Sequence, residues 1–163
     1  MVTCIPANKG KLGYEGLMLT GELRSKIDAI WNAFWSGGIA NPLEVIEQIT
    51  YLLFLRRLDE LHTLEEAKAA RFKKPIERSV FPTGKDARGV KYEQYRWSRF
   101  KNIEAREMYE LVSESIFPWL RKLGGNGTTY SHHMKDARFT IPTPALLAKV
   151  VGVLETIQQR AAA

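Results

Sequence analysis

The chain has 163 residues, enough for one domain with a hydrophobic core, and its 45% apolar content argues against disorder. The longest uninterrupted apolar run lies near Leu52 to Leu55 and is far shorter than the roughly 18 residues that span a bilayer, so we expect no membrane segment. Cys4 is the only cysteine, which excludes a disulfide framework. Residues 1–19 lack the continuous apolar stretch of a secretory signal. We therefore predict a cytoplasmic protein.

The net charge of +6 is concentrated between Lys68 and Lys101. This basic segment holds eleven Lys or Arg residues and three acids, a net charge of +8, while the rest of the chain carries −2. A strongly basic local surface indicates a polyanionic partner.

The first predicted elements are an irregular arm over residues 1–19 and a helix from Gly21 to Ser36. The arm is rich in glycine and lacks a clear period. Gly37-Gly38 can supply the left-handed conformation that ends many helices. The apolar face of this helix comprises Leu23, Ile27, Ile30, Trp31, Phe34 and Trp35.

A second helix is expected to begin at Asn41-Pro42 and to continue to about Ala70. Asn41 can cap the helix, Pro42 suits its first turn, and Glu44 stands where a capping-box acid reaches back.

Within this helix, the stretch Tyr51–Leu61 opens with five apolar or aromatic residues in a row. A helix that is apolar on every face must be buried on every face, so we expect a central helix around which the domain is built. Arg56 and Glu60 stand four residues apart and can form a local ion pair.

Between Lys73 and Ile103 the helical pattern stops, because prolines and glycines interrupt it. Residues Val90 to Trp97 mix aromatic and charged side chains that could make a short strand or hairpin. The segment therefore predicts a long basic loop, and loops of this length in compact domains are usually functional or disordered.

A third helix is expected from Glu104 to Leu123, with Pro118 kinking or splitting it near Phe117. The last helix should cover about Pro144 to Gln159. Their inward residues are expected to be Met108, Leu111, Val112, Ile116, Trp119, Leu120, Leu123, Leu147, Val150, Val151, Leu154 and Ile157. The fold class is therefore all-α: a small bundle of about four to six helices, with a long basic loop that can hold a short hairpin.

Motifs for catalysis are missing from the sequence. It has no G-x-G-x-x-G, Walker-type or G-x-S-x-G motif. Gly125-Asn126-Gly127 is interpreted as a helix end and turn. His132-His133 cannot share a helix face and has no acid or thiol cluster beside it, so we expect no metal site.

The basic segment is the best functional candidate, because it interleaves cations with aromatic residues. Cations neutralise phosphates, and an exposed aromatic ring can stack on a base. For Trp97 and Phe100 the alternative is a place in the core, which we favour for Trp97. The predicted DNA-contacting residues are Lys73, Lys74, Arg88, Lys91, Arg96, Arg99 and Lys101.

Four separate stretches resemble the N-terminal helical domain of modification (M) subunits of type I restriction-modification systems. Their order and rough spacing also agree with that family, so the resemblance covers about residues 20–160. The four stretches are Leu23 to Phe34, Tyr51 to Leu61, Tyr95-Arg96-Trp97 followed by Phe100, and Phe139-Thr140-Ile141-Pro142 leading into Leu146 to Val151.

This resemblance implies a domain that precedes the catalytic domain of a DNA adenine methyltransferase. Such a domain helps to hold double-stranded DNA and to sense its methylation state. It also packs against neighbouring subunits, and the implied partners are the specificity (S) subunit, the restriction (R) subunit and a second M subunit.

The catalytic motifs of that family, F-x-G-x-G for S-adenosylmethionine and N-P-P-[YF] for the flipped adenine, do not occur here. Asn41-Pro42 is followed by Leu43, and Phe117-Pro118 by Trp119. We therefore expect that this chain alone does not methylate DNA and binds no cofactor, with S-adenosylmethionine expected only for a full-length subunit. The terminal Ala161-Ala162-Ala163 would then mark a truncated chain or a gene fragment.

The competing interpretation is a stand-alone helical protein-interaction or nucleic-acid-binding module with no link to methylation. The two interpretations differ in what the gene should encode beyond Ala163, where the family interpretation expects both catalytic motifs.

Overall fold

The fold is all-α in the computed structural model, which describes residues 21–123 and 133–158. Within these ranges there is no strand, only an isolated antiparallel bridge between Lys85 and Lys91. The predicted fold class is thus confirmed. The elements are α1 (Gly21–Ser36), α2 (Pro42–Phe72), the 3-10 helix η1 (Tyr92–Tyr95), α3 (Trp97–Phe100), α4 (Ala105–Leu111), the π-helix η2 (Val112–Ile116), α5 (Phe117–Leu123) and α7 (Pro144–Gln158).

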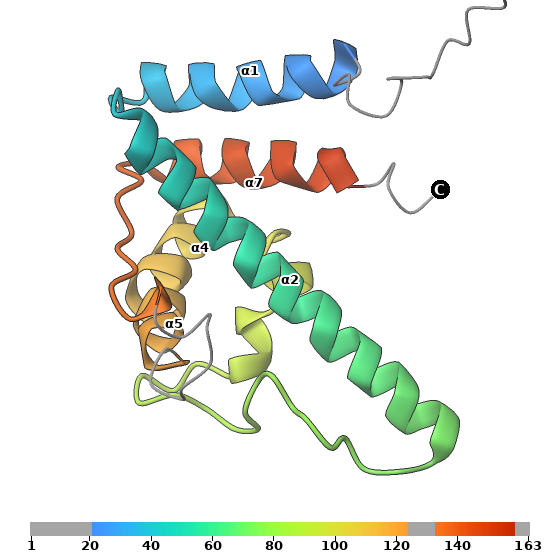
Figure 1. Ribbon diagram of the computed structural model, residues 1–163. Helices are drawn as coiled ribbons and strands as arrows, with labels where there is room; N and C mark the ends of the chain where they lie inside the picture. Colours follow the sequence, from blue (N-terminus) through green and yellow to red (C-terminus); the bar gives the residue numbers. More distant parts are fainter. Residues whose placement is uncertain (1–20, 124–132, 159–163) are drawn as a thin grey trace, which may run out of the picture.

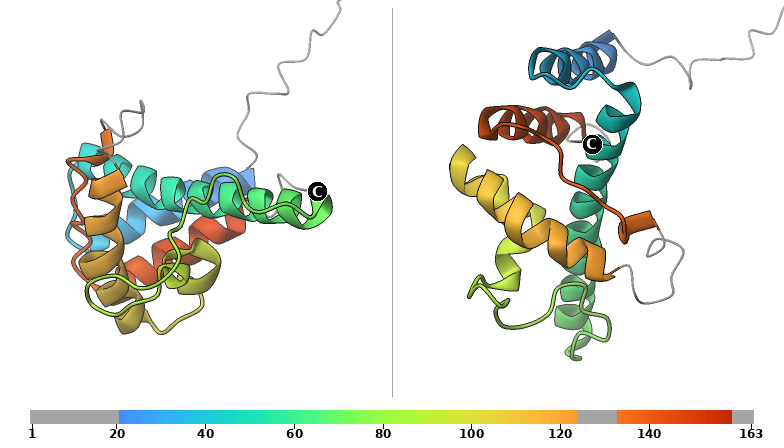
Figure 2. Two further views of the ribbon diagram at one scale, coloured as in Figure 1. Left: turned by 90° about the horizontal axis from the view of Figure 1, so that it is seen from below. Right: turned by 90° about the vertical axis from the view of Figure 1, so that its left-hand side faces the viewer.

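Helices α1, α7 and α4 follow one another in space, and α2 runs across them (Figure 1). Helix α7 lies between α1 and α4 and contacts both (Figure 2). The far half of α2 extends beyond this group, and the loop after it returns along α2 to reach α3. None of the helices in the described ranges combines the length and the apolar content needed to cross a membrane.

The ends of the first two helices follow the local signals in the sequence. Gly38 has φ +95°, the left-handed conformation expected after α1. The Asn41 side chain accepts a hydrogen bond from the Leu43 backbone N–H at 3.1 Å, and Pro42 occupies the first helical position. Helix α2 continues to Phe72, two residues beyond the predicted end.

The expectation that the apolar part of α2 is buried on every side is wrong. Leu52 and Leu55 are buried, whereas the Leu53 side chain between them is 44% exposed. The buried residues of α2, from Val45 to His62, recur at steps of three and four and share one face of the helix, so the domain covers only that face. The assignment of Trp35 to the apolar face of α1 is also wrong, because its side chain is 69% exposed, whereas the buried residues of α1 are Ile30, Ala33 and Phe34.

The third predicted helix is split near Phe117, as expected from Pro118. Helix α4 passes into the π-turn η2, in which the Phe117 N–H bonds to the Val112 carbonyl, and α5 then begins at Phe117. Pro118 lacks an N–H, so a helix that continued regularly through it would leave one carbonyl without a donor. The Glu104 side chain caps the start of α4 by accepting from the Arg106 N–H at 2.9 Å.

The second half of the basic segment forms helical turns and no strand. Residues 92–95 make η1 and residues 97–100 make α3, so the strand or hairpin expected over 90–97 is limited to the bridge between Lys85 and Lys91. The physical reason is a turn built by Asp86, whose carboxylate accepts the Arg88 and Val90 N–H groups at 2.9 and 2.8 Å.

Aromatic side chains anchor this region to α5. Phe81 stacks on Trp119 with ring centroids 5.2 Å apart, and Tyr95 meets the same ring at 5.5 Å. The Tyr95 hydroxyl donates to Asp86 at 2.5 Å. The loop is therefore fastened to the bundle at its second half. Of the sequence predictions, the arm over residues 1–19, Cys4, the Gly125-Asn126-Gly127 turn and His132 lie outside the described residues.

Candidate nucleic-acid interface

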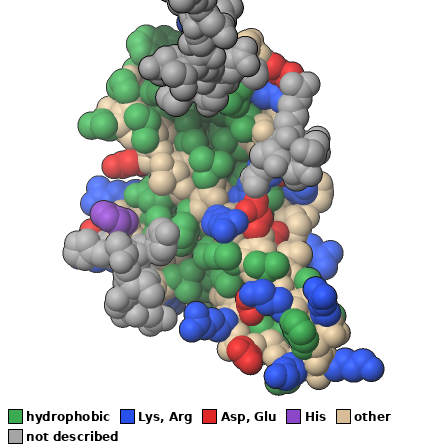
Figure 3. Space-filling view, turned by 45° about the vertical axis from the view of Figure 1, so that its right-hand side comes forward, with side chains coloured by type: hydrophobic (Ala, Val, Ile, Leu, Met, Phe, Trp, Pro, Cys, Tyr) green, Lys and Arg blue, Asp and Glu red, His purple; other side chains and the backbone are tan. Residues whose placement is uncertain are grey.

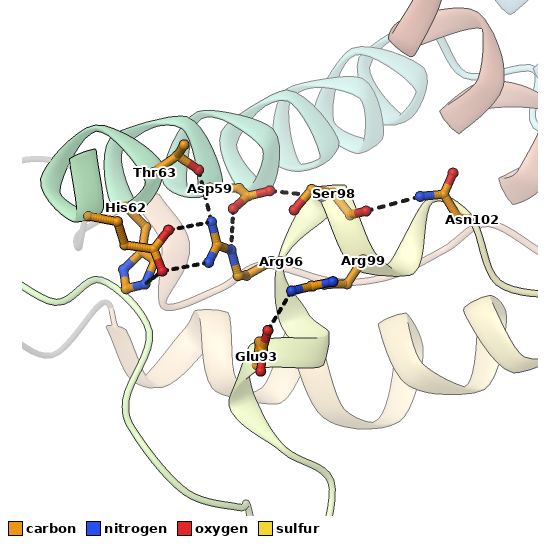
Figure 4. Close-up of polar contacts among 9 residues, drawn as sticks. Asp59, His62, Thr63, Glu93, Arg96, Ser98, Arg99 and Asn102 are labelled. Atoms are coloured by element: carbon orange, nitrogen blue, oxygen red, sulfur yellow. Dashed lines mark hydrogen bonds and ion pairs between the residues drawn. The ribbon is translucent and has the colours of Figure 1, made fainter. Parts of the chain in front are cut away.

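The basic segment starts on the last turns of α2 and ends just after α3, so its two ends have different surroundings. At the second end, Arg96 forms a cluster with α2. Its guanidinium donates to Asp59 at 2.6 Å, to Glu66 at 2.9 and 3.0 Å and to Thr63 at 2.8 Å. Figure 4 shows Arg96 pointing towards Asp59 and Thr63 on α2. We call Asp59, Thr63, Glu66, Arg96 and Ser98 the Arg96 cluster.

The charges of the Arg96 cluster stabilise one another in a partly buried place. Burial raises the pKa of Asp59, but hydrogen bonds from Ser98 and Arg96 outweigh it, so the pKa lies below its usual value. Burial likewise lowers the pKa of Arg96, and the carboxylates of Glu66 and Asp59 outweigh that effect and raise it. The Arg96 side chain is 11% exposed. It is therefore committed to contacts within the domain.

A second set of contacts fastens α3 to α7. The Trp97 indole N–H donates to Glu155 at 2.7 Å, and the Lys101 ammonium pairs with the same carboxylate at 2.6 Å. Arg56 lies over the Trp97 ring at 5.8 Å and donates to the Leu154 carbonyl at 2.8 Å. Burial raises the pKa of Glu155, but the hydrogen bonds from Lys101 and Trp97 lower it by more. The pKa of Glu155 therefore lies below its usual value.

Trp97 and Phe100 are core residues, as favoured for Trp97 from the sequence. Trp97 is 3% exposed and Phe100 is completely buried. Neither ring is available to stack on a base, so the aromatic part of the basic segment anchors α3. The predicted local pair on α2 is also present, with Arg56 Nε 3.5 Å from Glu60 Oε1.

The first end of the basic segment and the loop that follows it, as far as Lys91, carry exposed cations, and we call them together the open end. Lys73, Lys74 and Lys91 are exposed, and in the described part of the chain their side chains form no ion pair. Figure 3 shows Lys and Arg side chains gathered towards the lower right of the view, where α2 ends. Exposed cations of this kind can neutralise phosphates.

Two further predicted residues are exposed but paired with acids. Arg88 contacts Glu114 of η2, and Arg99 pairs with Glu93 at 2.7 Å. Both arginine side chains remain more than half exposed. Surface ion pairs of this kind contribute about 0–1 kcal/mol, so a phosphate can replace the carboxylate partner.

Two exposed cations of the same loop, Arg78 and Lys85, were not singled out from the sequence. They lie between Lys74 and Lys91, and their membership of the basic segment was the available signal. No sequence pattern identified the acids that pair with the second end of the segment. Glu155 is 58 residues from Trp97, and a sequence pattern does not join residues so far apart.

A pocket of about 540 Å³ lies between α2 and the loop, with Lys85, Lys91 and Arg96 among its lining residues. Glu66 and Glu93 also line it, which offsets the positive charge. Among the described residues, no three His, Cys, Asp or Glu side chains gather in a way that could hold a metal ion.

The stretches that carry the family resemblance meet in the structure. Asp59 and Arg96 join the second stretch to the third. Phe139 of the fourth stretch packs on Phe117 at 5.1 Å, and Phe117 meets Tyr51 of the second at 5.7 Å. The stretches that resemble the family therefore contain residues that pack together in the core of this fold.

Comparison with known protein families gives the same family as the resemblance of the four stretches. The family described as HsdM N-terminal domain, from the M subunit of type I restriction-modification methyltransferases, matches residues 23–154. No catalytic domain is found in the 163 residues. No curated protein and no solved structure matches the chain in the comparisons made.

Proposed function

Because the chain belongs to the family of HsdM N-terminal domains, we propose that it holds DNA and contacts neighbouring subunits in a type I restriction-modification adenine-N6 methyltransferase. The family match over residues 23–154 carries this proposal. The interpretation as a module unrelated to methylation is not retained, because the match covers most of the chain.

The DNA-contacting surface is proposed to be the open end of the basic segment. Lys73, Lys74 and Lys91 have the exposure that phosphate contact requires, and Arg88 and Arg99 can exchange a surface acid for a phosphate. Contacts of this kind position a duplex without reading its sequence. Arg96 and Lys101, also predicted to contact DNA, would act indirectly, by holding α3 and the loop in place.

The partners proposed for this domain are double-stranded DNA, the specificity subunit, the restriction subunit and a second M subunit. Methyl transfer from S-adenosylmethionine would take place in a catalytic domain outside these residues, and this chain alone would be inactive. The proposed compartment is the cytoplasm, where such an enzyme meets chromosomal DNA.

The salt dependence of DNA binding tests the proposed surface. We expect the triple variant Lys73→Gln, Lys74→Gln, Lys91→Gln to bind a duplex more weakly. The slope of log K against log salt should decrease by up to about 3, because each neutralised phosphate contributes about one unit. Binding would be measured by fluorescence anisotropy at several salt concentrations.

A matched control removes three exposed cations outside the basic segment, with Arg24→Gln, Lys135→Gln and Lys149→Gln. This variant has the same net charge as the test variant and should keep most of the wild-type slope. Equal slopes for the two variants would remove the loop from the proposed DNA surface.

A further inference from the structure

The pocket of about 540 Å³ between α2 and the loop combines two exposed cations with an aromatic wall. Lys85 and Lys91 line it from exposed positions, while His62 and Phe81 line it from buried ones and are 7% and 4% exposed. Sites for small organic ligands usually measure about 300 to 1,000 Å³, and the volume of this pocket falls in that range. We call it the His62 pocket.

The two lysines of the His62 pocket are held side by side by the backbone. Two hydrogen bonds flank the antiparallel bridge between Lys85 and Lys91 and make it a non-hydrogen-bonded pair. In such a pair the two Cα atoms are about 4.5 Å apart, and both side chains project from the same face. The flanking bonds run from the Asp86 N–H to the Val90 carbonyl at 2.8 Å and from the Tyr92 N–H to the Gly84 carbonyl at 3.1 Å.

The lysine pair lacks an anion. Like charges directly opposite one another in such a pair repel. Within the described part of the chain neither lysine side chain forms an ion pair. The two acids that line the pocket are engaged elsewhere, Glu66 with Arg96 at 2.9 Å and Glu93 with Arg99 at 2.7 Å. A phosphate between the two lysines would remove their repulsion and accept hydrogen bonds from both.

The aromatic wall holds a nitrogen without a partner. The His62 ring meets Phe81 edge to face with centroids 5.3 Å apart, and its Nε2 lies 3.4 Å from Glu66. Figure 4 shows this side chain next to the Arg96 cluster. Its Nδ1 is buried and, among the described residues, has no hydrogen-bond partner, which costs free energy. The edge of a nucleobase carries donors and acceptors side by side, so it can match Nδ1 whether that atom donates or accepts.

We propose that the His62 pocket binds one nucleotide, with its phosphate between Lys85 and Lys91 and its base against His62 and Phe81. The inference rests on the proposed function in choosing a nucleotide among phosphorylated ligands. The nucleotide is either free or unpaired in a DNA strand, since both present the same phosphate and base. Backbone contact to a paired duplex does not use the pocket, because paired bases stay stacked inside the helix.

Isothermal titration calorimetry of the chain with three probes tests the proposal. The probes are deoxyadenosine 5′-monophosphate, inorganic phosphate and deoxyadenosine. We expect the nucleotide to bind with a Kd below about 1 mM and at least about tenfold more tightly than either of the other probes, because its phosphate and base are linked. Nucleotide binding no tighter than that of inorganic phosphate would overturn the proposal.

A pair of charge variants tests the place of the phosphate. Lys85→Gln should weaken nucleotide binding at least about fivefold, because it removes one of the two cations on the phosphate. Arg78→Gln is the matched control, since Arg78 is an exposed cation of the same loop that does not line the pocket. Its effect should stay within about twofold, because salt screens charges outside the contact. Equal weakening by the two variants would overturn the site.

The variant His62→Phe tests the place of the base. It keeps an aromatic ring and removes both nitrogens. It should weaken nucleotide binding at least about fivefold and leave binding of inorganic phosphate unchanged, because it acts only on the base. Circular dichroism would show that the helices are retained. An unchanged affinity for the nucleotide would remove His62 from the site.

Two duplexes distinguish the sources of the nucleotide and separate this inference from the proposed function. If the nucleotide belongs to a strand, a duplex with one unpaired adenine should bind more tightly than the fully paired duplex, and Lys85→Gln should abolish the difference. If it is free, the two duplexes should bind equally while the mononucleotide still binds. A chain that keeps its salt slope on the paired duplex but binds neither the mononucleotide nor the unpaired adenine would overturn the pocket alone.

Discussion

The two ends of the basic segment have similar composition and different surroundings. At the second end, which we call the clamped end, Arg96 meets Asp59 and Lys101 meets Glu155, each at 2.6 Å. At the open end, Lys73, Lys74 and Lys91 face solvent. The difference teaches that a run of cations is not one functional unit. Those that meet acids from other helices hold the fold, and those that meet none are available to a partner.

The clamped end should fail first when an acid on α2 is removed. We expect Asp59→Ala to lower the free energy of unfolding by about 3 kcal/mol, because Arg96 would keep a partly buried charge with fewer partners. Urea denaturation measures this change. Asp28→Ala, at an exposed aspartate of α1, should stay within about 0.5 kcal/mol. Equal effects at the two positions would contradict the distinction between the ends.

The contact between α3 and α7 should have a smaller effect. Glu155→Ala removes the acceptor of Trp97 and the partner of Lys101, so we expect a loss of about 1.5 kcal/mol. Glu110→Ala is the control, since its ion pair with Arg106 is exposed and should contribute at most about 0.5 kcal/mol. Thermal unfolding of the two variants compares them, and a control that loses as much as Glu155→Ala would count against the clamp.

Acid should lower the free energy of unfolding, because it protonates the carboxylates that hold the clamped end. The pKa values of Asp59, Asp86 and Glu155 lie below their usual values in the folded chain. A lowered folded pKa gives stability that is fully present above about pH 4 to 5, where the unfolded carboxylates are ionised, and that is lost as pH falls through the folded value. Urea midpoints between pH 7 and pH 3 should therefore fall. The urea midpoint of the Asp59→Asn variant should fall less over this pH range. A fall as large as that of the wild type would show that Asp59 does not contribute to the pH dependence.

The smallest effect is expected at the open end. Lys73 ends α2 with φ +52°, a conformation that glycine adopts more easily. Lys73→Gly should raise the free energy of unfolding by about 0.5 kcal/mol while removing one cation from the proposed DNA surface. Lys74→Gly tests a neighbouring exposed lysine that is not in this conformation and should not stabilise the chain. Stabilisation by both variants would show that the left-handed backbone at Lys73 is not the cause.

Local signals predicted much of the fold. The start of α2 at Pro42 follows from Asn41 and Pro42 themselves, and the split at Phe117 follows from the missing N–H of Pro118. These signals act within one helical turn, so the sequence carries them directly. The helical form of residues 92–100 was missed, because it depends on packing of Tyr95 against Trp119, which stands 24 residues away.

The candidate site was predictable only as a segment. The basic composition identified residues 68–101, but it could not divide them into a clamped and an open end. That division depends on Asp59, Glu66 and Glu155, which reach Arg96 and Lys101 from other helices. The same limit explains why Trp35 and Leu53 were expected inside and lie at the surface.

The sequence by itself determined the bounds of the long helices to within about two residues, the absence of the catalytic motifs and the location of the excess positive charge, because each depends on residue type and short spacing. Only the tertiary structure decided which cations are engaged and which side of α2 is covered. Both outcomes depend on where distant helices pack, because the surrounding groups decide whether a charge is paired and whether an apolar side chain is buried.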